Sequence, residues 1–256
     1  MNRFTVYIFL GVILLAVACS NLPSSNTNAS PDTKEATSSS QHMISMTKTP
    51  ITIDGRADEA AWKQVSWKNI DQTWIGADPS PEDFKGRYKL LWDADRMYVL
   101  AEIQDDTLID IHANGLDRYW DDDCLEIFID ENQSRDIHQY NHSAFAYHIA
   151  LDGKVADIGL DSLPRYYDHL ISSRITSGNL STWEVAMQLY PDSYKDGSTM
   201  SPLQLSSGKK IGFAIAYCDN DHSAERENFI GSAVVEGEDK NRGWIDAGIF
   251  EKMILK

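Results

Sequence analysis

Basic residues are scarce in this chain of 256 residues. Its 23 Lys and Arg stand against 39 Asp and Glu, which leaves a formal net charge of −16 at pH 7. Binding to nucleic acid depends on a basic face that neutralises phosphates, so we expect no nucleic acid partner. An acidic chain is compatible with neutral glycans as ligands, and with Ca²⁺, which prefers oxygen ligands.

The common catalytic and cofactor motifs are also missing. The sequence contains no Gly-x-Ser-x-Gly, no His-Glu-x-x-His, no Cys-x-x-Cys-His and no glycine-rich phosphate loop. Asp123 and Glu126 form a candidate carboxylate pair. A glycosidase, however, holds its two carboxyls about 5–9.5 Å apart on either side of the scissile bond, which sequence spacing does not show. We therefore expect a protein that is not an enzyme.

Cysteine is rare, and the first of the three closes an N-terminal apolar segment. A short basic start precedes an almost wholly apolar run from Phe4 to Val17, and Ala18 stands directly before Cys19. This layout is typical of a secretory signal and is short for a membrane span. We interpret residues 1–19 as a lipoprotein signal peptide with Cys19 acylated; the alternatives are an ordinary signal peptide or an uncleaved anchor. The protein is then exported and held to a membrane only through lipid, and Ser20 favours the outer membrane or cell surface.

The other two cysteines, Cys124 and Cys218, lie in strand-like segments. In an exported protein they can form a disulfide, provided that their strands are adjacent or facing. Otherwise both are small buried apolar side chains. The sequence leaves both interpretations open.

Residues 20–46 are rich in Ser, Thr, Asn, Pro and Gln without a periodic apolar pattern, so a disordered tether is predicted there. A single folded domain is predicted over 47–256. Strand patterns dominate it, as in Cys124–Asp130, where Leu, Ile and Ile alternate with Glu and Phe. Many short strands with turn signals between them, and no alternation of strands with helices, predict an all-β sandwich or barrel.

The order of these segments resembles the family 9 carbohydrate-binding modules. The resemblance begins at Ile53-Asp-Gly-Arg-Ala-Asp-Glu-Ala-Ala-Trp62 and continues through Leu91–Ala101. Its sharpest part is Trp120-Asp-Asp-Asp-Cys-Leu-Glu-Ile-Phe-Ile-Asp130. Trp183-Glu-Val-Ala, Ile211-Gly-Phe213 and Trp244…Phe250 follow at the expected distances. The resemblance implies a two-sheet antiparallel β-sandwich, jelly-roll-like, often with structural Ca²⁺.

The resemblance also implies a sugar site. Trp120 is expected to stack on a sugar ring, Glu126 to accept hydroxyl hydrogen bonds, and His148 to stand in place of an Asn. Asp123 is expected to brace the loop or hold Ca²⁺. The candidate sugar-binding set is completed by Trp74 and Tyr147. For each aromatic the alternative is a packed loop or core residue, and for Glu126 a solvated or ion-paired strand residue.

Two departures from the family pattern affect this site. Where sugar-binding members carry a second clamping Trp, this chain reads Ile230-Gly-Ser-Ala-Val-Val235, and the strand Phe145–His148 lacks the family's Arg. The pocket is then open on one side, or clamped by Trp74, Tyr166 or Tyr167, or no longer binds sugar.

Carboxylates follow several strand ends and are candidate Ca²⁺ ligands. We select Asp121, Asp219 and Asp221; the alternative is Asx-turn chemistry on a solvated surface. His138, His142 and His148 are a weaker candidate set for Zn²⁺ or Cu²⁺.

The favoured function is therefore a non-catalytic carbohydrate-binding lipoprotein domain that captures glycan or oligosaccharide at the cell envelope, in carbohydrate catabolism. The alternatives are a haem- or metal-binding sandwich in electron transfer, a glycan-cleaving enzyme, and a structural or interaction sandwich that has lost sugar binding.

Overall fold

The structure is a computed structural model, and it describes residues 42–256. The regular structure of this part of the chain is almost entirely β-strand, with two short 3₁₀ helices, η1 (Trp62–Gln64) and η2 (Ala247–Ile249). None of its helices is long and apolar enough to cross a bilayer. The first seven strands are β1 (His42–Met46), β2 (Lys68–Ile70), β3 (Gln72–Ile75), β4 (Phe84–Trp92), β5 (Met97–Asp105), β6 (Cys124–Asp130) and β7 (Phe145–Ala150). The remaining strands are β8 (Val155–Ile158), β9 (Pro164–Tyr166), β10 (Leu170–Ser177), β11 (Leu180–Met187), β12 (Lys210–Asp219), β13 (Asn228–Gly231) and β14 (Glu251–Leu255).

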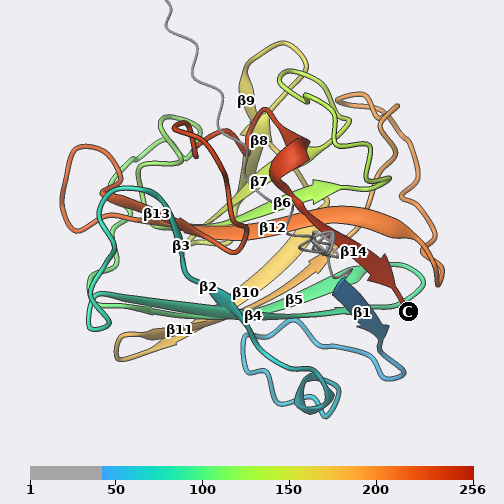
Figure 1. Cartoon of the computed structure of the whole chain (residues 1–256), viewed down its shortest axis with the longest axis horizontal. Coiled ribbons are helices and arrows are strands. Elements are labelled where there is room, and N and C mark those ends of the chain that lie inside the picture. The colour runs from blue at the N-terminus through green and yellow to red at the C-terminus, as the bar shows by residue number, and fades with distance from the viewer. Residues whose placement is uncertain (1–41) are drawn as a thin grey trace, which may run out of the picture. The chain divides into compact units, whose positions relative to one another are not determined.

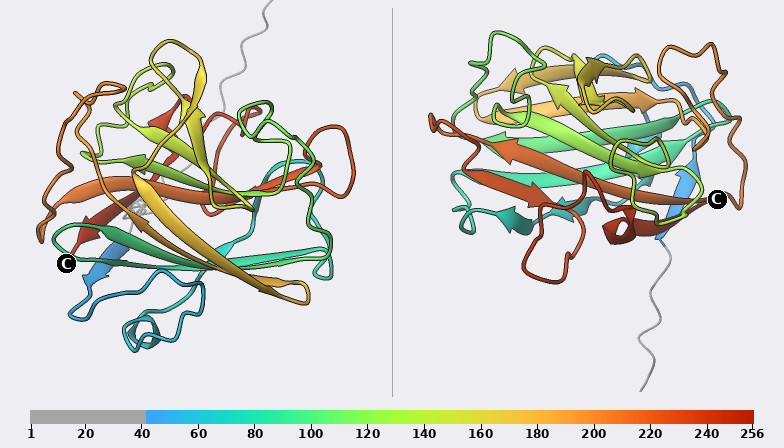
Figure 2. Two further views of the ribbon diagram at one scale, coloured as in Figure 1. Left: turned by 180° about the vertical axis from the view of Figure 1, so that it is seen from behind. Right: turned by 90° about the horizontal axis from the view of Figure 1, so that it is seen from above.

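The strands form two stacked layers (Figure 1). The upper layer in Figure 1, which we call the front sheet, runs β9–β8–β7–β6–β12–β14, with β13 beside β12 and β3 beside β13. The back sheet runs β10–β11–β5–β4, with β2 beside β4. The two layers also lie one above the other when seen from behind, and they overlap when seen from above (Figure 2). This arrangement confirms the predicted two-sheet β-sandwich.

Strand β1 joins the two sheets. Its first residues pair in parallel with β14 of the front sheet, and Ser45 and Met46 pair in parallel with β4 of the back sheet. All other strand pairs are antiparallel. The tether predicted over 20–46 is therefore wrong at its C-terminal end, because His42–Met46 is a strand of the sandwich.

The core lies between the sheets and follows the two-residue period of the strands. In β6, Leu125, Ile127 and Ile129 point inward and belong to the main core cluster, as the alternation predicted. The whole strand is buried, so its other face is covered as well.

That second face, the outer face of the front sheet, carries mostly small side chains. Ala216 lies beside Glu126, which lies beside His148, and Ala156 comes next in the same row. Small residues let the connecting loops lie close against the sheet. Gly243 is one such contact, since a Cβ on it would come 2.9 Å from the Phe128 ring. The loops thereby become the walls of a pocket whose floor is the sheet.

Candidate functional site

A cavity of about 310 Å³ opens on the outer face of the front sheet. Its floor is formed by Glu126 and Phe128 of β6, His148 of β7 and Ile158 of β8. Its walls come from the loop before β6, from β13, and from the segments on either side of β13. The wall residues are Tyr119, Trp120, Arg226, Phe229, Asn241 and Trp244.

A larger hollow of about 660 Å³ lies beside β2, β4 and β5. Its lining contains no Trp or Tyr, its one aromatic residue, Phe84, is buried, and its Arg87 is paired with Glu102. Because sugar recognition depends on exposed aromatic faces together with free polar groups, the smaller pocket is the better candidate.

Two tryptophans line the small pocket and stay partly open to solvent. Trp120 is 37 % exposed and Trp244 is 36 % exposed. Each lies in a loop that is held against the sheet by the residue directly before it in the sequence. Tyr119 packs edge-on against His148 with ring centroids 4.6 Å apart, and Gly243 lies against Phe128. The pocket therefore has a second indole, which our expectation based on residues 230–235 missed.

Glu126 is held at one oxygen only. Its Oε1 lies 2.6 Å from His148 Nε2 and 3.3 Å from Arg226 Nη1, and it accepts a hydrogen bond from the Cys218 thiol at 3.1 Å. Its Oε2 has no hydrogen-bond partner among the described residues. Burial alone would raise the pKa of Glu126, but His148 and Arg226 outweigh this and hold its pKa below the ordinary value. The carboxylate is thus charged, oriented and left with one free acceptor.

Arg226 supplies the cationic side of the pocket. Its guanidinium lies 4.2 Å above the centre of the Phe229 ring and donates to Asn241 Oδ1 at 3.0 Å. Its backbone N–H donates to Asp121 Oδ1 at 3.2 Å. The arginine that the family pattern places in β7 is absent. Arg226, from the segment between β12 and β13, lies near Glu126 instead. Because that segment has no periodic apolar pattern, the sequence does not predict that Arg226 reaches the pocket.

His148 lines the pocket from β7. Its Nδ1 is 3.0 Å from the carbonyl oxygen of Ala146 and its Nε2 faces Glu126. Both of these neighbours offer the ring a hydrogen-bond acceptor.

Two other predicted sugar-binding residues lie elsewhere. Tyr147 points into the core, where its hydroxyl lies 2.6 Å from His169 Nδ1. Trp74 is buried against Phe128 and Phe229, and its Nε1 donates to the Ala233 carbonyl. The prediction is wrong for both, because neither lines the pocket. Tyr166 and Tyr167, the other candidate clamps, do not line it either.

Three buried carboxylates gather beside the pocket at the ends of β5 and β12 and at the start of β6. Asp105, Asp123 and Asp219 each offer an oxygen within 4.8 Å of the others. Burial, followed by repulsion from neighbouring carboxylates, raises their pKa values to about 6, about 9 and about 8. Asp219 Oδ1 is buried without a hydrogen-bond partner, an unusual state for a polar atom. This donor set suits a hard cation.

The predicted Ca²⁺ ligands separate in the structure. Only Asp219 belongs to this buried triad. Asp221 lies with Asp83 and Asp106 in a second, more exposed acidic group. Asp121 belongs to neither acidic group, and it accepts a hydrogen bond from the Arg226 backbone. Asp123, predicted for the sugar or the cation, lies in the triad.

The histidines do not form a metal centre. His138 contacts the carbonyl oxygen of Gly243, and His142 contacts Asp196 Oδ1 at 2.8 Å. Within residues 42–256, no group of possible metal ligands contains a histidine. Cys19, the predicted lipidation site, lies outside the described residues.

An antiparallel sandwich with half-exposed indoles and an oriented carboxylate in one pocket defines a sugar-binding type of domain. Comparison with known proteins identifies its family: residues 53–256 match the model of the family described as "Carbohydrate family 9 binding domain-like". The chain belongs to this family of binding domains.

Among curated proteins, the chain is similar to parts of larger polysaccharide-degrading enzymes. It is 31 % identical over 116 residues to Endo-1,4-beta-xylanase C of Paenibacillus barcinonensis, which covers 45 % of this chain and 10 % of that enzyme. It is 23 % identical over 214 residues to Exoglucanase XynX of Acetivibrio thermocellus, covering 81 % of this chain and 16 % of that protein. The chain thus matches only a small fraction of each enzyme's length.

Solved structures agree on the fold. A family 9 carbohydrate-binding module from Caldicellulosiruptor kristjanssonii in complex with cellotriose superposes with a TM-score of 0.63 at 21 % identity, over 84 % of this chain and 93 % of that one. A putative carbohydrate-binding protein from Bacteroides uniformis gives a TM-score of 0.54 at 11 % identity, over 85 % of this chain and all of that one.

Proposed function

We propose that the pocket binds a sugar unit of a neutral glycan. Trp120 and Trp244 offer faces for the C–H side of a sugar ring, Glu126 Oε2 accepts hydroxyl hydrogen bonds, and Arg226 and Asn241 donate. The observation that carries this proposal is the asymmetry of Glu126, whose Oε1 has three partners while Oε2 has none. A buried charge is costly unless it is paired, so a carboxylate with one free oxygen beside two indoles suits a polar ligand with an apolar face.

Cello-oligosaccharides and glucose are the first ligands to try, because related modules hold cellotriose and glucose. A glycan array, probed with and without EDTA, tests the proposal over a wide range of sugars. We expect saturable binding by the wild-type protein and none by the double variant Trp120→Ala/Trp244→Ala. Failure of the wild-type protein to bind any glycan in the presence of Ca²⁺ would refute the proposal.

We propose further that Asp105, Asp123 and Asp219 hold a structural Ca²⁺. The partnerless Asp219 Oδ1 and the crowding of three buried carboxyls support this. Asp123 also accepts from the backbone N–H groups of Ile109 and Asn220, which belong to the two loops that lead into the pocket walls. Calorimetric titration with Ca²⁺ should show one site that Asp219→Asn abolishes, while the exposed Asp136→Asn leaves it unchanged. Ca²⁺ binding by the Asp219 variant equal to wild type would contradict the assignment.

We propose that the domain is carried by a lipoprotein anchored through Cys19, exported to the outer membrane or cell surface, where it captures glycan for catabolism. The support is the sequence pattern of residues 1–19. Metabolic labelling with a fatty acid should label the wild-type protein and not Cys19→Ser, while Cys124→Ser remains labelled. Equal labelling of the two variants at Cys19 and Cys124 would contradict the anchor.

A further inference from the structure

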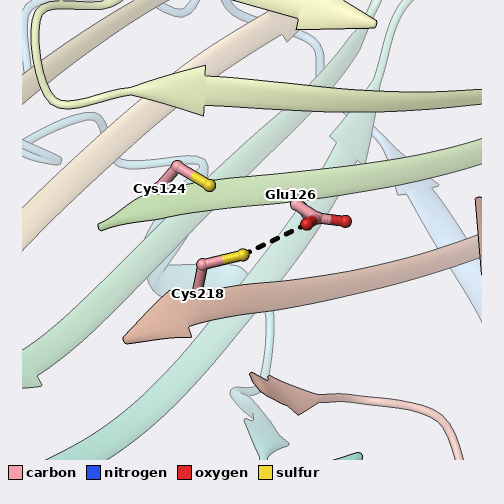
Figure 3. A group of neighbouring side chains, drawn as sticks. All are labelled: Cys124, Glu126 and Cys218. Atoms are coloured by element: carbon pink, nitrogen blue, oxygen red, sulfur yellow. Dashed lines mark hydrogen bonds between the residues drawn. The ribbon is translucent and has the colours of Figure 1, made fainter. Parts of the chain in front are cut away.

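Cys124 and Cys218 lie opposite each other on two neighbouring strands of the front sheet. They are direct partners in the antiparallel register of β6 and β12. Both are buried free thiols, and their sulfurs lie within 4.8 Å of each other and of an oxygen of Glu126 (Figure 3). Directly opposed residues of an antiparallel pair have Cα atoms about 4.5–5.5 Å apart, which lies inside the range of about 4.4–6.8 Å that a disulfide spans. The backbone already has the spacing that a bridge requires.

Only one of the two thiols touches the pocket's carboxylate. Cys218 donates its S–H to Glu126 Oε1 at 3.1 Å, and its sulfur accepts from Arg226 Nη1 at 3.0 Å. Cys218 is therefore one of the three groups that orient Glu126. A bridge to Cys124 would remove that S–H and draw the sulfur away from Arg226.

We propose that Cys124 and Cys218 form a cross-strand disulfide when the chain folds under oxidising conditions, and that this bridge weakens ligand binding at Glu126. The second half rests on the proposed sugar binding. In the reaction each thiol gives up its hydrogen, one S–S bond forms, and two electrons and two protons reduce a partner disulfide, such as oxidised glutathione, to two thiols.

The timing of bridge formation follows from burial. Thiol–disulfide exchange needs a thiolate in contact with the partner disulfide. Both sulfurs are buried, and burial raises the pKa of both thiols. The folded dithiol is therefore slow to oxidise, and the bridge is set during folding and then protected. An exported chain meets the required oxidising environment.

The effect on the ligand follows from the loss of one hydrogen bond to a charged acceptor. With the bridge closed, Glu126 keeps His148 and Arg226 but loses the Cys218 donor, so its carboxylate is less firmly oriented. Because a thiol is a weak hydrogen-bond donor, the loss of this one bond predicts roughly three- to tenfold weaker sugar binding in the bridged form.

The test uses the full chain carrying Cys19→Ser, refolded once with oxidised glutathione and once with a reductant. Intact mass with alkylation reports the bridge, and calorimetry reports the affinity for a sugar identified on the array. We expect the oxidised protein to lose the mass of two hydrogens, to resist alkylation and to bind more weakly than the reduced protein. Absence of the bridge after oxidative refolding would overturn the inference.

Two variants separate the bridge from the thiol. Cys124→Ala cannot form the bridge but keeps the Cys218 donor, so it should bind like the reduced protein in both conditions. Cys218→Ala can form no bridge and also lacks the thiol donor, so it should bind weakly after refolding under either condition. Equal affinities of the bridged and reduced proteins would overturn the second half. If the reduced protein binds no sugar, the sugar proposal and the affinity effect fail together, while the mass measurement still decides on the bridge.

Discussion

Glu126 is the only carboxylate among the residues that line the pocket, and burying its charge lowers the stability of the fold unless the charge is paired. It is almost fully buried, and its charge is balanced by Arg226 and His148 at a single oxygen. A buried ion pair adds little net stability when complete, but removal of one partner leaves an uncompensated charge in a poorly solvated place. The arrangement is best explained by ligand binding, because stability alone does not require it.

Arg226→Met tests this balance. The variant keeps an apolar side chain over Phe229 but leaves Glu126 with only His148 as a charged partner. We expect the free energy of unfolding, measured with urea, to fall by about 3–5 kcal/mol. Sugar binding should weaken as well.

Arg87→Met is the matched control. Arg87 pairs with Glu102 on the surface, where an ion pair contributes about 0–1 kcal/mol. Equal losses in the two variants would show that Glu126 is not held by Arg226.

At the scale of elements, β1 shows how a short segment closes the sandwich. Its residues pair with β14 and then with β4, so the strand passes from the front sheet to the back sheet. Trp92 of β4 fixes the crossing, since its Nε1 donates to the Ile44 carbonyl at 3.0 Å. Ile44 is buried in the main core, whereas its neighbour Met43 points to solvent.

Ile44→Ala should therefore destabilise the domain by about 2–5 kcal/mol through the lost burial and the cavity it leaves. Met43→Ala, in the same strand at 65 % exposure, should change stability by less than about 0.5 kcal/mol. Thermal unfolding of the two variants measures the difference. An unchanged melting temperature for Ile44→Ala would mean that β1 does not belong to the cooperative fold.

These elements differ in how far the sequence predicts them. Strand β6 is predictable because Leu125, Ile127 and Ile129 alternate with residues of the other face. Strand β1 is not, because five residues with one buried side chain carry no periodic signal, and its parallel pairing depends on distant strands.

The same distinction holds for the site. Trp120 and Glu126 share one short motif, so a sequence pattern places them together. Trp244 and Arg226 reach the pocket only because their loops fold over the small residues of the front sheet. Tyr147 was misplaced by one step of the strand period, since its neighbour His148 faces the pocket while Tyr147 faces the core.

At the scale of the whole molecule, part of the excess of acidic residues is concentrated in two clusters of carboxylates. The chain carries a net charge of −16, and six carboxylates gather in the two acidic groups around Asp105 and Asp106. Without a cation the buried triad favours protons, since its pKa values are raised above the ordinary value of about 4. At the proposed Ca²⁺ site, protons and Ca²⁺ would therefore compete for the same carboxylates.

The stability of the metal-free protein should accordingly fall as pH rises. Between about pH 4 and pH 9 the folded triad binds more protons than the unfolded chain, and stability decreases with pH wherever the folded state binds the excess. Below about pH 6.5 the lowered pKa values of His138, His142 and His169 act in the opposite direction. Melting temperatures in EDTA should therefore decline between about pH 6.5 and pH 9, while saturating Ca²⁺ should reverse the decline. A Ca²⁺-independent profile would contradict a cation site.

Calorimetric titration of single variants measures whether the two tryptophans bind sugar. The ligand is cellotriose, or the best sugar from the array, and the variants are Trp120→Ala, Trp244→Ala and Tyr166→Ala. One stacked ring contributes about 1–3 kcal/mol, so each tryptophan variant should bind roughly 5- to 150-fold more weakly. Tyr166→Ala, which removes an exposed aromatic outside the pocket, should bind like wild type. Wild-type affinity in both tryptophan variants would mean that the pocket does not bind sugar through Trp120 and Trp244.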